Sequence, residues 1–313
     1  MSSSAAHVSS ATNAPHALDT KLVRKRFDRA AASYADAAVV QREVGRRLLE
    51  RFDVMRLAPT TILDVGCGPG THTHALAARF PDASVIAIDH APAMVACATP
   101  VARRLLARMP GFNKRQRIRG LVADMGALPL RREHAEVLWS NFALQWANDL
   151  PALFAEWSRV LKIGGAIMFT APGPDTLIEL RRALTAAGEY ADRRLQRLTD
   201  LHDIGDMLVH AGFADPVMDM EVITLEYATC AALWRDLRAQ GATNAMLARP
   251  RGLLTPRRLR AVESALDGMR KPEGPIRISV EVIYGHAWKV APKKTAEGHG
   301  IVRLESISRG ASA

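Results

Sequence analysis

Cysteines and long apolar runs are both scarce in this chain of 313 residues. Its three cysteines, Cys67, Cys97 and Cys230, have neither the spacing of a disulfide framework nor that of a metal site. We therefore expect reduced thiols, no bound metal and a cytoplasmic protein. No apolar run approaches the ~18 residues that a membrane span requires. The Ser- and Ala-rich start also lacks the basic and apolar regions of a secretory signal.

Positive charge is in excess, because 42 Lys and Arg residues outnumber 32 Asp and Glu residues and give a net charge of +10. This excess favours a negatively charged partner, although a solvated, arginine-rich surface explains it equally well. Hydrophobic residues make up 48% of the chain. That content is enough for a large core in one elaborated domain or in two domains.

Apolar periodicity divides the chain into a structured region, 21–290, and two tails, 1–20 and 291–313, that we expect to be disordered. Helical patterns cover 21–57. Strands are then predicted at 61–65, 84–88, 118–123, 136–141 and 165–171, with helices between them at 71–79, 92–107 and 151–161. This alternation is typical of an α/β fold with a doubly wound parallel sheet, whose ligands bind at the carboxyl ends of the strands. Helical insertions at 175–211 (175–189 and 201–211) and 229–270, with strands at 217–227 and 278–288, complete the domain.

The most informative segment is the turn after the first strand, with the sequence ILDVGCGPG. Three glycines, Gly66, Gly68 and Gly70, let the backbone approach a ligand where a Cβ would collide. The next strand ends in Asp89, where a carboxylate can accept hydrogen bonds from both hydroxyls of a ribose. Because position 71 is Thr, the third glycine of the dinucleotide fingerprint is missing. The pattern suits a nucleoside cofactor without a pyrophosphate, and S-adenosylmethionine is the candidate.

Further residues near the strand ends complete the predicted cofactor site. Asp64 can hold the ammonium group of the methionyl part, although an acid here could also cap the next helix. Met94 is either a core residue or a soft thioether against the adenine. Asp124 and Met125 follow the third strand, where a carboxylate can accept from the adenine amino group; the alternative is an ordinary loop acid. Asn141 ends the fourth strand, close to the transferring methyl group.

The fourth strand also bears on the methyl acceptor. It ends in Ser-Asn-Phe-Ala and lacks the Asn/Asp-Pro-Pro-aromatic signature of amino-directed nucleic-acid methylases, and the chain has no Pro-Cys nucleophile. Both observations count against a nucleic-acid partner. Methyl transfer from a sulfonium is an in-line displacement, in which orientation alone can supply ~7–11 kcal/mol. A carboxylate acceptor is already ionised at neutral pH and needs no strong general base.

The motifs ILDVGCGPG, VADMGALPL and WSNFALQWANDLPALFAEWSRVLKIGGAIMFT, together with Asp89, resemble class I S-adenosylmethionine-dependent methyltransferases over residues 60–171. The segments VRKRFDRAAASYADAAVVQREVGRRLLE, GPDTLIELRRAL, RDLRAQGATNA and EVIYGHAWK extend the likeness to about 23–290. They are similar to the malonyl-acyl-carrier-protein O-methyltransferases of biotin synthesis. This resemblance implies a seven-stranded sheet with a helical lid. It also implies methylation of the free carboxylate of a malonyl thioester on acyl carrier protein, at the start of pimeloyl synthesis.

The same resemblance assigns roles outside the cofactor site. Tyr34 matches a lid residue, with a buried aromatic as the alternative. Binding a substrate carboxylate also requires a cation near the methyl group, for which Arg181 is the first candidate and Arg182 the second. The acidic carrier protein implies a basic docking face, and 235–260 contains seven arginines and one acid; a solvated helix explains the cluster equally well. Two other relationships keep the fold and change the substrate. GPDTLIELR also resembles complex I assembly factors that modify proteins, and NFALQW resembles small-acid methyltransferases such as those acting on trans-aconitate.

Overall fold

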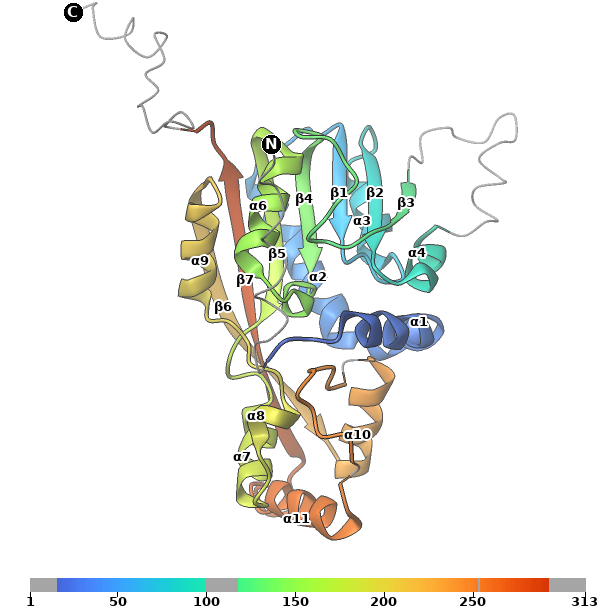
Figure 1. Ribbon diagram of the computed structural model, residues 1–313, viewed down its shortest axis with the longest axis vertical. Helices are drawn as coiled ribbons and strands as arrows, with labels where there is room; N and C mark the ends of the chain where they lie inside the picture. Colours follow the sequence, from blue (N-terminus) through green and yellow to red (C-terminus); the bar gives the residue numbers. More distant parts are fainter. Residues whose placement is uncertain (1–15, 100–117, 242, 253, 293–313) are drawn as a thin grey trace, which may run out of the picture.

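The structure, a computed structural model, describes residues 16–99, 118–241, 243–252 and 254–292. These residues form a seven-stranded sheet with helices around it (Figure 1). In spatial order its strands are β3 (Ile118–Val122), β2 (Ser84–Asp89), β1 (Thr61–Val65), β4 (Ala135–Asn141), β5 (Leu161–Pro172), β7 (Ile276–Lys289) and β6 (Phe213–Tyr227). The first five are parallel, and β7 runs antiparallel to both of its neighbours. The predicted doubly wound, mostly parallel α/β sheet is confirmed.

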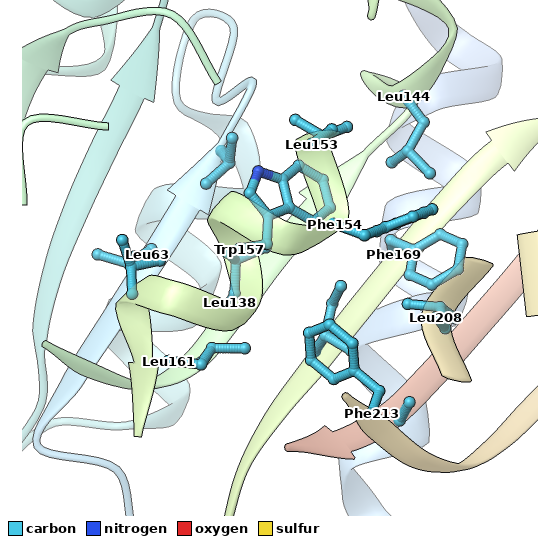
Figure 2. Close-up of a cluster of buried hydrophobic side chains, with 14 of the residues drawn as sticks. Leu63, Leu138, Leu144, Leu153, Phe154, Trp157, Leu161, Phe169, Leu208 and Phe213 are labelled. Atoms are coloured by element: carbon cyan, nitrogen blue, oxygen red, sulfur yellow. The ribbon is translucent and has the colours of Figure 1, made fainter. Parts of the chain in front are cut away.

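Helices cover both faces of the parallel strands, which is why β1 and β4 are nearly continuous runs of buried residues. On one face lie α2 (Val39–Glu50), the short helix η2 (Arg51–Val54) and α3 (Thr71–Arg79). On the other lie α6 (Leu150–Val160) and α9 (Leu201–His210). Figure 2 shows this second core, where Phe154 and Trp157 of α6 pack with Phe169 of β5. Each such side chain contributes about 1.5–3 kcal/mol by leaving water.

A separate, smaller core surrounds the far ends of β6 and β7, which extend beyond the parallel strands (Figure 1). We call this part the helical subdomain. It consists of α7 (Ile178–Ala186), α8 (Ala191–Arg194), α10 (Cys230–Ala239) and α11 (Pro256–Asp267). Its core includes Leu184, Leu233 and Leu266 packed with Ile278 of β7. Helix α1 (Thr20–Ala37) lies between this subdomain and the carboxyl ends of β1 and β2 (Figure 1).

The amino-terminal boundary of the domain differs from the predicted one. Residues 16–20 are structured, because Leu18 forms a β-bridge with Met246 and Leu247 N donates to Ala17 O at 2.8 Å. Asp19 then caps α1 by accepting from Leu22 N at 3.0 Å. The prediction of a disordered tail to residue 20 is therefore wrong at its inner edge. Residues 1–15 and 293–313, the rest of both predicted tails, lie outside the described residues.

Several elements also differ in extent from their predicted bounds. The helix predicted at 92–107 is α4 (Pro92–Ala98), and 100–107 lies outside the described residues. The helical region predicted at 229–270 is two helices, because Gly241 adopts φ +66° just after α10 and ends it. Strand β6 begins at Phe213, four residues early, and a bulge at Asp215 and Pro216 interrupts its pairing.

Candidate functional site

A cavity of about 380 Å³ opens at the carboxyl ends of β1, β2 and β4, beneath α1. This is the place where the strand order reverses, and open α/β sheets bind their ligands there. The volume lies in the range of small-molecule sites. Eight of the eleven predicted site residues line it: Tyr34, Gly66, Gly68, Asp89, Met94, Asp124, Met125 and Asn141. Asp64 lines a smaller cavity of about 50 Å³ that shares Tyr34, Gly66, Gly68 and Asn141 with the first.

The glycine corner between β1 and α3 has the left-handed backbone that its sequence predicts. Gly66 and Gly68 have φ +77° and +53°. A Cβ on Gly66 would lie 2.4 Å from the Cβ of Ala143, so no other residue fits this place. Gly70, at φ +91°, lines neither cavity, and a Cβ there would come within 2.6 Å of the Ala98 Cα. Gly70 therefore has a structural role: it forms the turn before α3 and allows α4 to pack closely against it.

Asp89 is held in a fixed orientation at the end of β2. Its Oδ2 accepts from Gly68 N at 3.0 Å and its Oδ1 accepts from Ala91 N at 2.8 Å. A carboxylate has about four acceptor positions, so both oxygens keep the capacity to accept another hydrogen bond. Burial raises the pKa of Asp89 above its ordinary value, against the opposing effect of the two backbone donors. The carboxylate thus ties the glycine corner to β2 and lines the cavity as an acceptor.

Asp64 lies in the smaller cavity and is 2% exposed. Thr73 Oγ1 donates to its Oδ2 at 2.5 Å, and burial raises its pKa to about 7. In the same cavity, Gln41 of α2 donates from Nε2 to Gln240 Oε1 at 3.1 Å. The Gln41 Oε1 is buried without a hydrogen-bond partner among the described residues. Asp64 and Gln41 both line this small cavity, and carboxylate and amide oxygens are acceptors that suit an ammonium group.

The residues predicted to contact an adenine lie at the other end of the larger cavity. Met94 is fully buried, with Ala31 of α1 and Ala91 in the same cluster. Asp124 is exposed, and its Oδ1 accepts from Gly126 N at 2.8 Å in a tight turn. Met125 is fixed because its carbonyl accepts from Trp157 Nε1 at 3.0 Å. These side chains form an apolar wall with one carboxylate at its rim.

Helix α1 covers the larger cavity with one face. Thr20, Val23, Phe27 and Tyr34 all line it, and their spacing places them on the same side of a helix. Burial, and secondarily the nearby Asp89 carboxylate, raises the pKa of Tyr34 to about 12. Its hydroxyl is therefore neutral at physiological pH. Tyr34 lies on the side of α1 that faces the glycine corner, since a Cβ on Gly68 would be 3.8 Å from its Cε1, and its role as a lid residue stays a prediction.

Two aromatic residues of this wall were not predicted from the sequence. Phe27 and Trp146 line the cavity with their ring centroids 5.2 Å apart in an edge-to-face arrangement. Phe27 lies seven residues before Tyr34, two turns along the same helix face, and that spacing was the available signal. Trp146 belongs to η3 (Leu144–Trp146), and its contact with α1 depends on the tertiary fold.

Asn141 ends β4 with both ends of its amide engaged. Its Nδ2 donates to Gln41 O at 2.8 Å, and its Oδ1 accepts from Thr170 Oγ1 at 2.7 Å. The next residue, Phe142, has φ +51°, an uncommon conformation for a bulky side chain. Its N–H donates to Thr170 Oγ1 at 3.0 Å. Asn141 thus joins α2 to the sheet at the edge of both cavities, and the strained turn directs the chain away from β4 there.

Arg181 lies away from these cavities. It is on α7, where its Nη1 donates to Asp192 Oδ1 at 2.7 Å, and it lines a separate cavity of about 440 Å³ with His16 and Asp200. The structure therefore does not bring Arg181 together with the other predicted site residues, and its substrate role stays a prediction.

The arginines of 235–260 are distributed over three parts of the helical subdomain: α10 (Arg235, Arg238), the following segment (Arg249, Arg251) and α11 (Arg257, Arg258, Arg260). One of them is already paired within the subdomain, because Arg258 Nη1 lies 3.2 Å from Glu189 Oε1.

We also searched the described residues for metal sites, disulfides and membrane-spanning helices. No group of three or more His, Cys, Asp or Glu residues in the described part of the chain could hold a metal ion. All three cysteines are free. Within the same residues, no helix combines the length and apolar character that crossing a membrane requires.

The fold, the glycine corner and the acceptors of both cavities define a class I S-adenosylmethionine-dependent methyltransferase. Comparison with known proteins agrees, because residues 63–169 match the family model described as "Methyltransferase domain". The chain is 45% identical to the malonyl-[acyl-carrier protein] O-methyltransferase of Nitrosospira multiformis, over 91% of this chain and 94% of that protein. It is 44% identical to the protein of the same name from Halorhodospira halophila, over 92% and 94%. The chain belongs to the malonyl-[acyl-carrier protein] O-methyltransferase family, and the predicted family is confirmed.

Solved structures support the fold alone. The YcgJ protein of Bacillus subtilis has a TM-score of 0.54 at 16% identity, covering 79% of this chain and all of that chain. A putative methyltransferase from Bacillus halodurans has the same score at 17% identity, covering 78% and 97%. S-adenosylmethionine is the cofactor of the class, and bound to the enzyme it supplies an electrophilic methyl group on sulfur.

Proposed function

We propose that this enzyme transfers the methyl group of S-adenosylmethionine to the free carboxylate of a malonyl thioester on acyl carrier protein. The match to proteins of that printed name, across nine-tenths of the chain, carries the proposal. The chain also retains a cavity that fits the donor. The biotin pathway stays a prediction from the resemblance. The cytoplasmic location stays a prediction from the cysteine content.

We assign the cofactor contacts residue by residue. Asp89 accepts from the ribose hydroxyls, because it lines the larger cavity and each of its oxygens, already fixed by one backbone donor, can accept another hydrogen bond. Asp64 and Gln41 receive the ammonium group in the smaller cavity. Met94 packs against the adenine. Gly66 and Gly68 supply backbone close to the methionyl part, and Asp124 and Met125 bind the exocyclic and ring nitrogens of the adenine.

The chemistry requires little beyond this positioning. A malonyl carboxylate is an anion at neutral pH, so it attacks without losing a proton and forms the methyl ester directly. The enzyme must align the acceptor oxygen with the sulfur–methyl bond and exclude water, for which orientation supplies up to ~7–11 kcal/mol. Phe27 and Trp146 wall the cavity with apolar surface. Tyr34 covers the glycine corner as the lid residue.

The carrier protein is acidic, and we propose that it docks on the arginine-rich side of the helical subdomain. Arg251 and Arg257 are exposed there and have no acidic partner among the described residues. Opposite charge on two partners chiefly raises the association rate. The absence of nucleic-acid and membrane partners stays a prediction from the sequence.

Substrate competition tests the proposal. Release of S-adenosylhomocysteine is measured with malonyl-carrier protein, malonyl-coenzyme A and free trans-aconitate as acceptors. We expect the highest kcat/KM on the carrier-bound substrate, and Asp82→Ala should behave as wild type because Asp82 is exposed at the far end of β2. Preferential methylation of the free acid would identify a small-acid methyltransferase. Cofactor binding without transfer to any of the three acceptors would support a protein-modifying role.

A further inference from the structure

A second cavity lies beside α1, on a helix face next to the one that covers the cofactor cavity. Its volume is about 450 Å³, and α1, α8 and the segment 243–252 form its walls. All of its charged lining residues are arginines: Arg26, Arg194, Arg249 and Arg251. We call it the arginine pocket. Two of these arginines, Arg26 and Arg194, come from outside the 235–260 cluster, so the fold and not the local sequence assembles the pocket.

The positive charge of the arginine pocket is only partly balanced. Arg26 Nη1 donates to Thr243 O at 2.7 Å, and Arg249 Nη1 donates to Met246 O at 2.8 Å. These carbonyls fix the two guanidinium groups but carry no charge that would neutralise them.

Two carboxylates face the four guanidinium groups. Asp19 Oδ2 lies 3.8 Å from Arg249 Nη2, and Glu189 Oε2 lies 2.8 Å from Arg194 Nη2. Arg251 is exposed, with no acidic partner among the described residues. Burial and the neighbouring Arg249 lower the pKa of Arg26, which agrees with an excess of positive charge. Several guanidinium groups converging on one hollow are the donors that bind a phosphate oxygen by charged hydrogen bonds.

The arginine pocket also lies close enough to the cofactor cavity for one extended substrate to reach both. Arg26 and Phe27 are consecutive residues of α1, so their side chains leave the helix about 100° apart. Phe27 lines the cofactor cavity, and Arg26 lines the arginine pocket. The two cavities therefore lie on neighbouring faces of one helix, which is roughly 10–12 Å across. A pantetheine chain has about as many bonds between phosphate and thioester as four extended residues, which span roughly 13–14 Å.

We propose that the arginine pocket binds the phosphodiester that joins the pantetheine arm to the carrier protein, while the malonyl end of that arm enters the cofactor cavity. This inference rests on the proposed function and adds a specific subsite to it. It assigns Arg26 and Arg251 to substrate recognition. It also predicts that the enzyme prefers thioesters that carry the phosphate over thioesters that lack it.

The test compares two soluble substrates, malonyl-phosphopantetheine and malonyl-pantetheine, which differ only in the phosphate. We expect the wild-type enzyme to have a kcat/KM about tenfold higher on the phosphorylated substrate, the size of one charged hydrogen bond. Arg251→Gln should bring this ratio close to one. Arg56→Gln is the matched control, because Arg56 is exposed just before β1, at the amino ends of the parallel strands, and lines neither cavity; it should keep the wild-type ratio.

A binding measurement separates this inference from the proposed function. Titration calorimetry with unacylated phosphopantetheine and pantetheine needs no turnover. Tighter binding of the phosphorylated compound, lost in Arg251→Gln and retained in Arg56→Gln, supports the arginine pocket even if methyl transfer fails. Equal binding of the two compounds by the wild type, or the same ratio in both variants, overturns the pocket whether or not malonyl-carrier protein is methylated.

Discussion

Removing the carboxylate at the end of β2 should weaken cofactor binding by a predictable amount. Each oxygen of Asp89 accepts one backbone N–H, from Gly68 and Ala91, and each can accept one ribose hydroxyl as well. Hydrogen bonds to a charged group contribute about 1.5–3 kcal/mol. One carboxylate serves both hydroxyls beside an open cavity, so we take that range for Asp89→Ala as a whole. It corresponds to a Kd for S-adenosylmethionine roughly 10- to 150-fold higher.

Isothermal titration calorimetry with S-adenosylhomocysteine at pH 7 measures this loss without turnover. Asp82→Ala is the control, because Asp82 is exposed at the other end of the same strand. Asp89→Ala also frees the N–H groups of Gly68 and Ala91, so urea unfolding of the variant must first show a folded protein. A folded Asp89→Ala variant with a Kd within twofold of wild type would refute the ribose assignment.

Other predictions concern the glycine corner, the buried acid and the docking surface. Gly66→Ala and Gly68→Ala should each lower the unfolding free energy by about 1–2 kcal/mol through backbone strain. Gly66→Ala should lower it by about 1–3 kcal/mol more, because the new methyl group overpacks against Ala143. Equal urea midpoints for the two variants would contradict this difference. Burial raises the pKa of Asp64 to about 7, so affinity for the cofactor ammonium should rise on the order of tenfold from pH 5.5 to pH 7 as the carboxyl ionises, and Asp64→Asn should abolish this slope. Over about pH 4–7 the folded protein holds a proton there that the unfolded chain has lost, so the free enzyme should lose stability as pH rises through that window in urea titrations. Arg257→Glu should slow association with malonyl-carrier protein at low salt and flatten its salt dependence; an unchanged rate in stopped-flow mixing would exclude this residue from the docking face.

The predictions that held depend on short-range sequence. A buried strand, a glycine turn and an acid at the end of the next strand are fixed by neighbouring residues. The parallel pairing of β1 with β2, which sets Val65 beside Ile88, then brings Gly68 to Asp89. Local pattern therefore specifies both the sheet and the residues at its strand ends that line the cavity. The glycines illustrate the limit, because sequence alone could not separate Gly70, which faces Ala98, from Gly66 and Gly68, which line the cavity.

The residues that local pattern missed are brought to the site by distant parts of the chain. Gln41 reaches the smaller cavity because α2 is tied to β4 through Asn141. Trp146 meets α1 across more than a hundred residues. The position of Arg181 depends on how α7 packs around the extended ends of β6 and β7, which no periodicity reveals. The arginine pocket likewise joins α1 to residues more than 160 positions away.

The central claim is tested most directly by following the methyl group itself. The enzyme is incubated with malonyl-carrier protein and S-adenosylmethionine labelled in the methyl group, and the carrier is analysed by tandem mass spectrometry. We expect one labelled methyl per carrier, located as an ester on the distal malonyl carboxylate and removed by mild alkali. A label found on a protein side chain, or an unmodified carrier in the presence of bound cofactor, would contradict the account.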